Sequence, residues 1–123
     1  LGKLYFRADR IKKVSTNLSC KKIKKNMGWC DDPSSKKYYN KLIKINKKTK
    51  LSFEKLFQKN SMYDYMIPIN YNTKKRELGR GSAIFLHIAT KNFSKTKGCI
   101  SIKKKDFIKI LSMISNKTKI IIH

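Results

Sequence analysis

The sequence predicts a mainly β domain in which one helix covers part of a sheet or sandwich. Short apolar or β-branched segments follow one another along the chain, and residues 104–114 alone carry apolar side chains at clear helical spacing. With 123 residues, of which 40% are hydrophobic, the chain can bury one core but hardly two. We therefore expect a single domain over residues 1–123.

The first part of the chain predicts one strand and two irregular segments. Residues 4–8 alternate loosely between apolar and polar side chains, as a strand does. Residues 9–26 are basic without a clear period and are interpreted as a long loop, and residues 27–35 combine Gly, Trp, Cys, two Asp and Pro, which is typical of a turn around a buried anchor. Because a strand-like run comes first, with no leader pattern before it, we expect the chain to begin inside its domain, truncated at its N-terminus, so that a signal peptide or anchor upstream stays open.

The middle of the chain predicts two strands separated by a short helix. Residues 38–45 favour a strand over a helix. Residues 52–57 are predicted as a short helix with Ser52 as its N-cap. Residues 63–70 are aromatic and β-branched but contain Pro68, so this strand is expected near a sheet edge or with a bulge.

The last part of the chain carries the strongest structural signals. Residues 71–81 are predicted as a polar connection, and residues 83–89 form the most apolar segment, which is typical of a buried strand. Residues 98–102 predict another short strand, and residues 104–114 an amphipathic helix. Residues 118–122 are β-branched and are predicted to close the domain as a terminal strand.

The charge of the chain indicates an anionic partner or a composition rich in Lys. The 31 Lys and Arg against 7 Asp and Glu give a formal net charge of +24. Nucleic acid, an anionic membrane and a cell-wall polymer all fit that charge. Lys occurs in every segment rather than in one basic, aromatic patch, so we do not expect nucleic acid as a partner. No apolar run approaches the roughly 20 residues that a membrane span needs.

A thiol and an imidazole are the candidate catalytic groups. The three cysteines match no metal-binding spacing, so we expect neither a metal nor another cofactor. His87 lies on the apolar run, whereas the second histidine, His123, is the last residue. Gly98 precedes Cys99, and consecutive N–H groups there suit an oxyanion hole for acyl transfer by a Cys–His pair. The alternative is a buried cysteine and a core histidine without catalytic roles.

Two segments carry a family resemblance. Residues 79–89 (Gly-Arg-Gly-Ser-Ala-Ile-Phe-Leu-His-Ile-Ala) and 96–102 (Thr-Lys-Gly-Cys-Ile-Ser-Ile) resemble the active-site region of the L,D-transpeptidase (YkuD-type) catalytic domain. Residues 5–10 and 27–33 are similar to motifs of a compact proteobacterial branch of that family. The resemblance thus covers nearly the whole chain and implies a YkuD-type β-sandwich with one helix after the strand of the catalytic cysteine.

By this resemblance, each catalytic role falls on a matching residue. Cys99 is the nucleophile, His87 is the general base and acid, the N–H groups of Gly98 and Cys99 are the oxyanion donors, and the backbone carbonyl of Ile88 orients the imidazole. The implied reaction takes a peptidoglycan stem peptide, forms a thioester with loss of a D-amino acid, and passes the acyl group to an amine of another stem. The resemblance also implies covalent inhibition by carbapenem β-lactams and a location in the periplasm or cell envelope.

Departures from the family pattern concern substrate choice. Lys97 replaces a frequent His and Ser101 replaces a basic or amide residue, while the loop between His87 and Thr96 is shorter than usual. We predict that Thr96, Lys97, Ser101 and Trp29 contact substrate, with Trp29 alternatively anchoring its own loop. Hydrolysis with water as acceptor, which would give a carboxypeptidase or amidase, needs the same catalytic residues and stays open, as does the cross-link type.

Two further features have simple structural interpretations. Asp106 is expected to interact favourably with the helix N-terminus, and Asp31 and Asp32 are expected to cap a turn. A disulfide between Cys20 and Cys30 suits an oxidising compartment, but their spacing does not predict it.

Overall fold

A computed structural model describes residues 1–89 and 99–121 of the chain. Within these ranges the chain forms short strands and one helix, in the following order: β1 (Leu4–Phe6), β2 (Cys20–Lys22), β3 (Met27–Cys30), β4 (Leu42–Lys44), β5 (Phe53–Lys55), β6 (Tyr65–Pro68), β7 (Phe85–Ile88), β8 (Ile100–Ile102) and α1 (Lys104–Leu111). The fold is therefore mainly β, with its helix directly after β8, as the sequence predicts.

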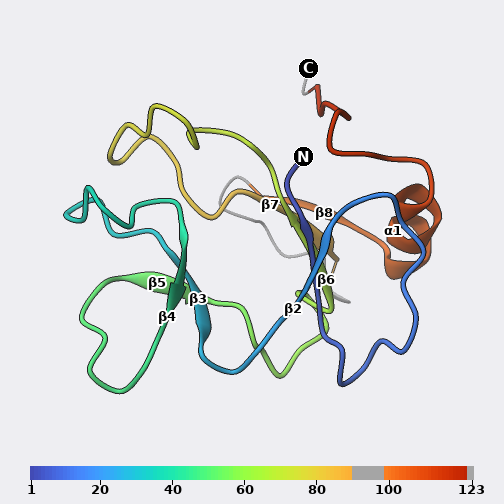
Figure 1. The fold of residues 1–123 in the computed structure, drawn as a ribbon, viewed down its shortest axis with the longest axis horizontal. Coiled ribbons are helices and arrows are strands. Elements are labelled where there is room, and N and C mark those ends of the chain that lie inside the picture. Colours follow the sequence, from blue (N-terminus) through green and yellow to red (C-terminus); the bar gives the residue numbers. More distant parts are fainter. Residues whose placement is uncertain (90–98, 122–123) are drawn as a thin grey trace.

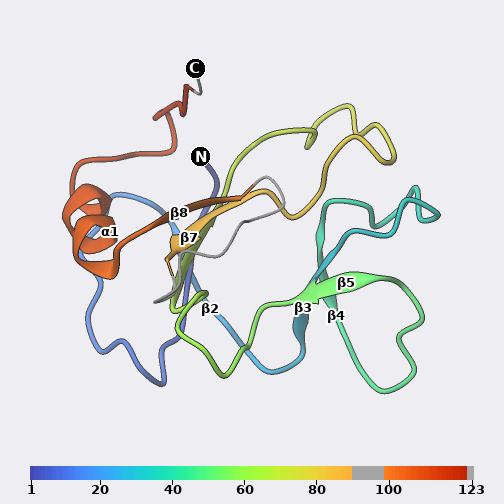
Figure 2. The ribbon, with the colours of Figure 1, turned by 180° about the vertical axis from the view of Figure 1, so that it is seen from behind.

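The strands form two sheets that pack face to face. The five-stranded sheet has the order β2-β1-β6-β7-β8, and the three-stranded sheet has the order β4-β3-β5. The β1–β2 and β7–β8 pairs are parallel, and the other pairs are antiparallel. Figures 1 and 2 show α1 and the three-stranded sheet on opposite sides of the five-stranded sheet. The larger sheet is thus covered on both faces.

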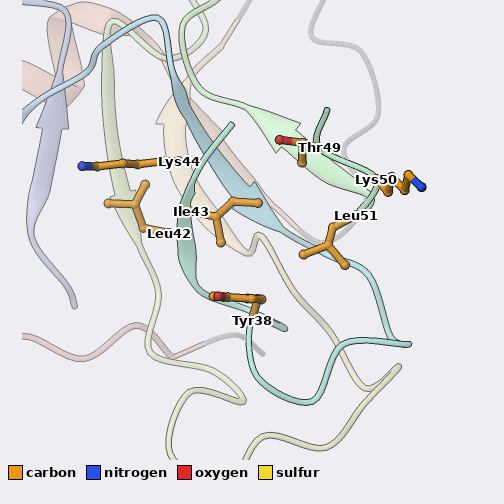
Figure 3. A pocket seen from close by; sticks show the side chains of 7 residues that line it. All are labelled: Tyr38, Leu42, Ile43, Lys44, Thr49, Lys50 and Leu51. Atoms are coloured by element: carbon orange, nitrogen blue, oxygen red, sulfur yellow. The ribbon is translucent and has the colours of Figure 1, made fainter. Parts of the chain in front are cut away.

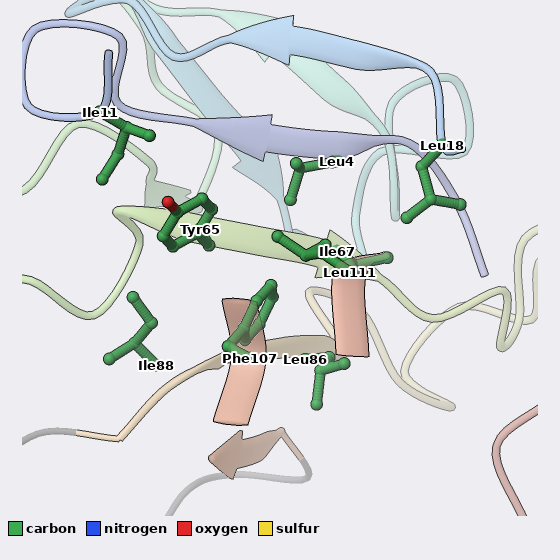
Figure 4. Close-up of a cluster of buried hydrophobic side chains, with 9 residues drawn as sticks. All are labelled: Leu4, Ile11, Leu18, Tyr65, Ile67, Leu86, Ile88, Phe107 and Leu111. Atoms are coloured by element: carbon green, nitrogen blue, oxygen red, sulfur yellow. The ribbon is translucent and has the colours of Figure 1, made fainter. Parts of the chain in front are cut away.

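Each face of the larger sheet has its own apolar core. The first lies between the sheet and α1, where Phe107 and Leu111 pack against side chains of β6 and β7 (Figure 4). The second lies between the two sheets and contains Tyr5, Met66 and Phe85 from the larger sheet and Met27 and Trp29 from the smaller one, together with Ile23, Leu56 and Tyr63. Because successive strand residues point to opposite faces, the residues of β7 divide between these two cores.

Two predictions about local structure in the smaller sheet are wrong. Residues 53–55 form strand β5 rather than a helix, and Ser52 caps nothing helical: its N–H and hydroxyl donate to Asp32 and Asp31. Residues 27–30, expected within a turn, form the fully buried central strand β3. Pairing between segments distant in sequence decides both outcomes, and local patterns do not report it.

Three further differences concern strand edges. Residues 20–22 of the predicted long loop form β2, an exposed edge strand paired with β1. Residues 118–121, expected within a terminal strand, belong to no strand in the described chain, and residue 122 lies outside the described residues. Strand β6 lies at the centre of its sheet rather than at an edge. Pro68 is tolerated there because it ends β6, beyond the residues that the ladder pairs with β1.

Candidate active site

Strand β7 places His87 in the layer between the two sheets. Phe85 belongs to the core between the sheets, whereas Leu86 and Ile88 belong to the core under α1. His87 shares the face of Phe85 by the period of two. It is buried, with 3% of its surface exposed, and pairs with Met66 of β6 on one side and Ser101 of β8 on the other.

Cys99 lies immediately before β8 and on the same face of the sheet. Ile100 and Ile102 pack against the core under α1, so Cys99 and Ser101 point toward the smaller sheet, as His87 does. The ladder pairs Leu86 with Ile100, which brings Cys99 beside Phe85. Cys99 and His87 thus lie on neighbouring strands and on the same face, two residues apart in register.

The Cys99 thiol is held by backbone groups of the chain that enters β7. Sγ donates to the carbonyl of Ala83 at 3.1 Å, and the N–H of Phe85 points to Sγ at 3.4 Å. Burial raises the pKa of the thiol, the Phe85 hydrogen bond lowers it, and the charge of Glu54 raises it again. In this structure Cys99 is therefore a protonated, half-buried thiol that needs a base to become a nucleophile.

The ring of His87 is oriented by the backbone. Nδ1 lies 2.9 Å from the carbonyl oxygen of Ile88. A carbonyl only accepts, so Nδ1 carries the proton and donates it there, which leaves Nε2 of the neutral ring as an acceptor. Burial lowers the pKa of His87, while the Ile88 bond and the charge of Glu54 raise it. The ring is thus arranged as a neutral imidazole with one basic nitrogen.

The segment before β7 is fastened by a buried asparagine. Asn40 is 5% exposed and has a φ of 57°. Its Oδ1 accepts from the N–H of Ala83 at 3.3 Å and from Nε1 of Trp29 at 2.9 Å, and its Nδ2 donates to the carbonyls of Tyr71 and Asn72. Asn40 therefore joins Trp29 of the smaller sheet to Ala83, the residue whose carbonyl accepts a hydrogen bond from the Cys99 thiol.

The other predicted residues divide between the core, the site and the part of the chain that is not described. Trp29 is 8% exposed and packs edge-on against Phe85, with ring centroids 5.4 Å apart, which gives it a structural position; contact with substrate stays a prediction. Ser101 is half-buried beside His87. Thr96, Lys97 and Gly98 lie outside the described residues.

The carboxylates expected in structural roles have them. Asp106 lies in the first turn of α1. Asp32 accepts from the N–H and hydroxyl of Ser34, and Asp31 accepts from the hydroxyl of Ser52. Cys20, which is exposed, and Cys30, which is buried, are both free thiols, so no disulfide joins them.

Within residues 1–89 and 99–121, no cluster of His, Cys, Asp and Glu is suited to hold a metal ion. The described chain also contains no helix with the length and apolar character needed to cross a bilayer.

A hollow beside β4 is lined by Tyr38, Ile43 and Leu51 (Figure 3). Leu42 and Lys44 also line it, so the hollow lies along the edge strand β4, and neither His87 nor Cys99 contributes to its lining.

Comparison with known families agrees with this geometry. The family model of the YkuD L,D-transpeptidase catalytic domain matches residues 4–122. The chain belongs to the L,D-transpeptidase family. Neither the curated proteins nor the solved structures contain a match to it. The predicted family and the predicted β-sandwich are confirmed.

Membership of the L,D-transpeptidase family defines the general chemistry. The domain is that of cysteine-dependent enzymes that act on peptidoglycan, are associated with the cell envelope and are in general sensitive to carbapenems. Three residues around the site were not found by the sequence analysis: Asn40, Glu54 and Tyr63. Residues 52–57 have no clear period of two, so the local sequence carried no signal that would place Glu54 on a strand.

Proposed function

We propose that this L,D-transpeptidase cross-links peptidoglycan stem peptides through a thioester on Cys99, with His87 as general base and acid. The observation that carries the proposal is the placement of both side chains on one face of the parallel pair β7–β8, with Nδ1 of His87 on the carbonyl of Ile88. The bond to Ile88 leaves Nε2 as the proton acceptor of a ring that shares the thiol's face of the sheet.

The reaction has two steps. Nε2 of His87 takes the thiol proton, Sγ of Cys99 bonds to the carbonyl carbon of the donor stem, and the carbon–nitrogen bond to the terminal D-amino acid breaks. The imidazolium gives its proton to the departing amine. In the second step an amine of another stem attacks the thioester, its proton passes to His87, and the thiol leaves. The N–H groups of Gly98 and Cys99 are proposed to stabilise the oxyanion in both steps.

The surroundings of the pair support substrate binding at this place. Ser101 stands beside His87 in the ladder and is half-buried, so its hydroxyl is available to a bound peptide. We propose Ser101, Thr96 and Lys97 as substrate contacts, and Trp29 as a more distant one. We further propose the periplasm as the working compartment, where stem peptides are found, and an acceptor amine rather than water as the usual acceptor.

Intact-mass spectrometry with a carbapenem tests the thiol chemistry. We expect wild type to gain the mass of one carbapenem, Cys99→Ala to gain none, and His87→Gln to react at least 100-fold more slowly, because general base catalysis contributes about 10²–10⁴-fold. Cys20→Ala is the matched control, since it removes an exposed thiol and should acylate as wild type does. Absence of an adduct on wild type would refute the proposed nucleophile.

A second measurement separates transfer from hydrolysis. The enzyme is incubated with a stem tetrapeptide alone and then with a second stem that carries a free amine. Transpeptidation predicts a cross-linked mass that appears only with the acceptor, whereas a carboxypeptidase predicts the shortened peptide in both mixtures. If the shortened peptide is the main product when the acceptor is abundant, the hydrolytic alternative is correct.

A further inference from the structure

The inner face of the smaller sheet carries one acidic side chain. Register partners in an antiparallel pair share a face, and Glu54 of β5 pairs with Trp29 of β3. Trp29, Met27 and Leu56 on this face all belong to the core between the sheets. Glu54 is half-buried among these neighbours, so its carboxylate loses part of its hydration, and its presence on this face indicates a role other than packing.

Glu54 is held in place by neutral donors. The hydroxyl of Tyr63 donates to its Oε1 at 3.0 Å, and Nε2 of Gln58 donates to the same oxygen at 3.1 Å. Among the described residues, no Lys, Arg or His lies within ion-pair distance of Glu54. Tyr63 is 4% exposed, and burial followed by the Glu54 charge raises its pKa, so it remains a phenol that donates. Within the described residues the carboxylate is therefore held by neutral hydrogen-bond donors and not by a cationic partner.

Tyr63 connects this carboxylate to both catalytic side chains. Its ring meets the ring of His87 edge to face, with centroids 5.6 Å apart and planes at 85°. The same ring meets Phe85 at 5.6 Å and 86°, and the N–H of Phe85 points to Sγ of Cys99. A contact of this kind fixes the plane of an imidazole that has one other anchor, the carbonyl of Ile88.

We propose that Glu54, held by Tyr63, is a positioning residue of the active site: the pair fixes the His87 ring, and the carboxylate stabilises the positive charge that His87 acquires during acyl transfer. This proposal rests on the proposed function for the identity of the reaction. The charge matters most once Sγ is bonded to carbon, because the thiolate charge has then gone and the imidazolium must keep its proton until the amine leaves.

The electrostatics of the site agree with this role. Glu54 raises the pKa of His87, against the lowering by burial, and it raises the pKa of Cys99 in addition to burial. The charged and titratable side chains of the described chain that border this layer are Tyr5, Arg7, Lys44, Glu54, Tyr63, His87 and Cys99; Arg7 lies over the ring of Phe57 and bonds to Asp9, and Lys44 is the exposed register partner of Met27. Of these, Glu54 is the one carboxylate, and it raises the pKa of both His87 and Cys99, so removing it should lower both pKa values.

The decisive experiment compares Glu54→Gln with Glu77→Gln. Both remove one negative charge isosterically, but Glu77 is exposed and paired with Arg80, away from the site. The pKa of His87 is measured by NMR titration of its ring protons in a His123→Gln background, which leaves one histidine. The pKa of Cys99 is measured from the pH dependence of its alkylation by iodoacetamide, read by peptide mass.

We expect both midpoints to move to lower pH in Glu54→Gln and to stay at their wild-type values in Glu77→Gln. Below the thiol midpoint, Cys99 should then be alkylated several-fold faster in Glu54→Gln. If the two midpoints in Glu54→Gln equal those of wild type, the proposal is wrong. These readouts need no peptidoglycan, so a failure of carbapenem acylation would contradict the proposed function and leave this inference to its own test.

A second set of variants tests the part played by Tyr63. Tyr63→Phe keeps the ring and removes the hydroxyl that holds Glu54, so its His87 midpoint should lie between those of wild type and Glu54→Gln. Adding Tyr63→Phe to Glu54→Gln should produce no further change in that midpoint. Glu54→Asp keeps the charge, so its His87 midpoint should lie close to that of wild type. Independent, additive shifts would contradict the pair. If Glu54→Gln folds poorly, Tyr63→Phe alone still tests the proposal, because an unchanged His87 midpoint in that variant would contradict it.

Discussion

The side-chain oxygen of Asn40 accepts a hydrogen bond from the backbone N–H of Ala83, 3.3 Å away. Through this bond the smaller sheet fixes the residue whose carbonyl accepts from the Cys99 thiol. Ala83 has a φ of 56°, which is unusual for a residue with a Cβ and requires such support. The position of the nucleophile therefore depends on a residue 59 positions away in sequence (99 minus 40).

Asn40→Ala should lower the free energy of unfolding by about 2–4 kcal/mol. The change leaves the buried indole N–H of Trp29 without its acceptor and puts alanine at a φ of 57°, where asparagine is better tolerated. Urea denaturation measures the loss. The exposed Asn17 provides a control, because Asn17→Ala should change stability by no more than about 0.5 kcal/mol. A loss below about 1 kcal/mol for Asn40→Ala would show that the hydrogen bonds of the Asn40 side chain contribute little to stability.

Burial of His87 should make the domain less stable as the solution becomes mildly acidic. Burial lowers the pKa of His87 below the ordinary 6.5, so below that pH the unfolded chain binds a proton that the folded chain resists. The free energy of unfolding is therefore fully retained above about pH 6.5 and declines as the pH falls toward the folded value. Urea denaturation between about pH 7 and pH 5 should show this decline in wild type.

His87→Gln is the control for that decline, since every other titratable group is common to both proteins. The difference in slope between wild type and His87→Gln isolates the imidazole. Parallel curves for the two proteins would mean that His87 titrates normally in the folded state.

A second contribution to the free energy of unfolding, from the ion pair of Arg7 and Asp9, should be lost at lower pH. The bidentate Arg7 guanidinium, with contacts of 2.7 and 2.8 Å, holds the pKa of Asp9 at about 2, below its ordinary 3.8. Because the folded pKa is depressed, the stabilisation is present above about pH 3.8 and is lost as the pH falls toward 2. The melting temperatures of wild type and Asp9→Asn should therefore converge over this range. A constant difference between the two melting temperatures would contradict the coupling.

The parts of the fold that the sequence predicts are those with a strong local signal. Strand β7 is apolar at every position except His87, and α1 has a clear helical period, so the sequence predicts both. Strand β2 has three exposed residues and no hydrophobic signal, and β5 forms only because β3 offers it a partner. Residues 118–121 have β-branched side chains but lie in no strand, since propensity without a paired neighbour is insufficient.

The residues of the candidate site also differ in whether the sequence predicts them. Cys99, His87 and Ile88 are close in sequence to a recognisable motif, and the register of β7 and β8 relates them. Glu54 and Asn40 reach the site from other segments of the chain, and nothing in their local sequence indicates that they approach it. The packing of sheets from distant parts of the chain brings them there, and the pattern of a single segment carries no information about that packing.

Gly28 provides a test of how closely the smaller sheet is packed. A Cβ at this position of β3 would meet Ile45 Cγ2 at 2.9 Å and the ring of Phe53 at 3.0 Å, closer than atoms in a core normally approach. Gly28→Ala should therefore lower the free energy of unfolding by about 1–3 kcal/mol, the usual cost of overpacking. Because β3 and β5 carry Trp29 and Glu54, the displacement should also slow carbapenem acylation of Cys99.

Gly79→Ala is the matched control for this change. Gly79 has a φ of 79°, and a Cβ there meets no atom within 4 Å, so alanine adds backbone strain without a collision. We expect Gly79→Ala to lower stability by about 1 kcal/mol and to leave the acylation rate unchanged, because the strain arises in a polar connection outside both sheets. Equal acylation rates for the two variants would show that the site tolerates movement of the smaller sheet, and would weaken the case for a carboxylate positioned from β5.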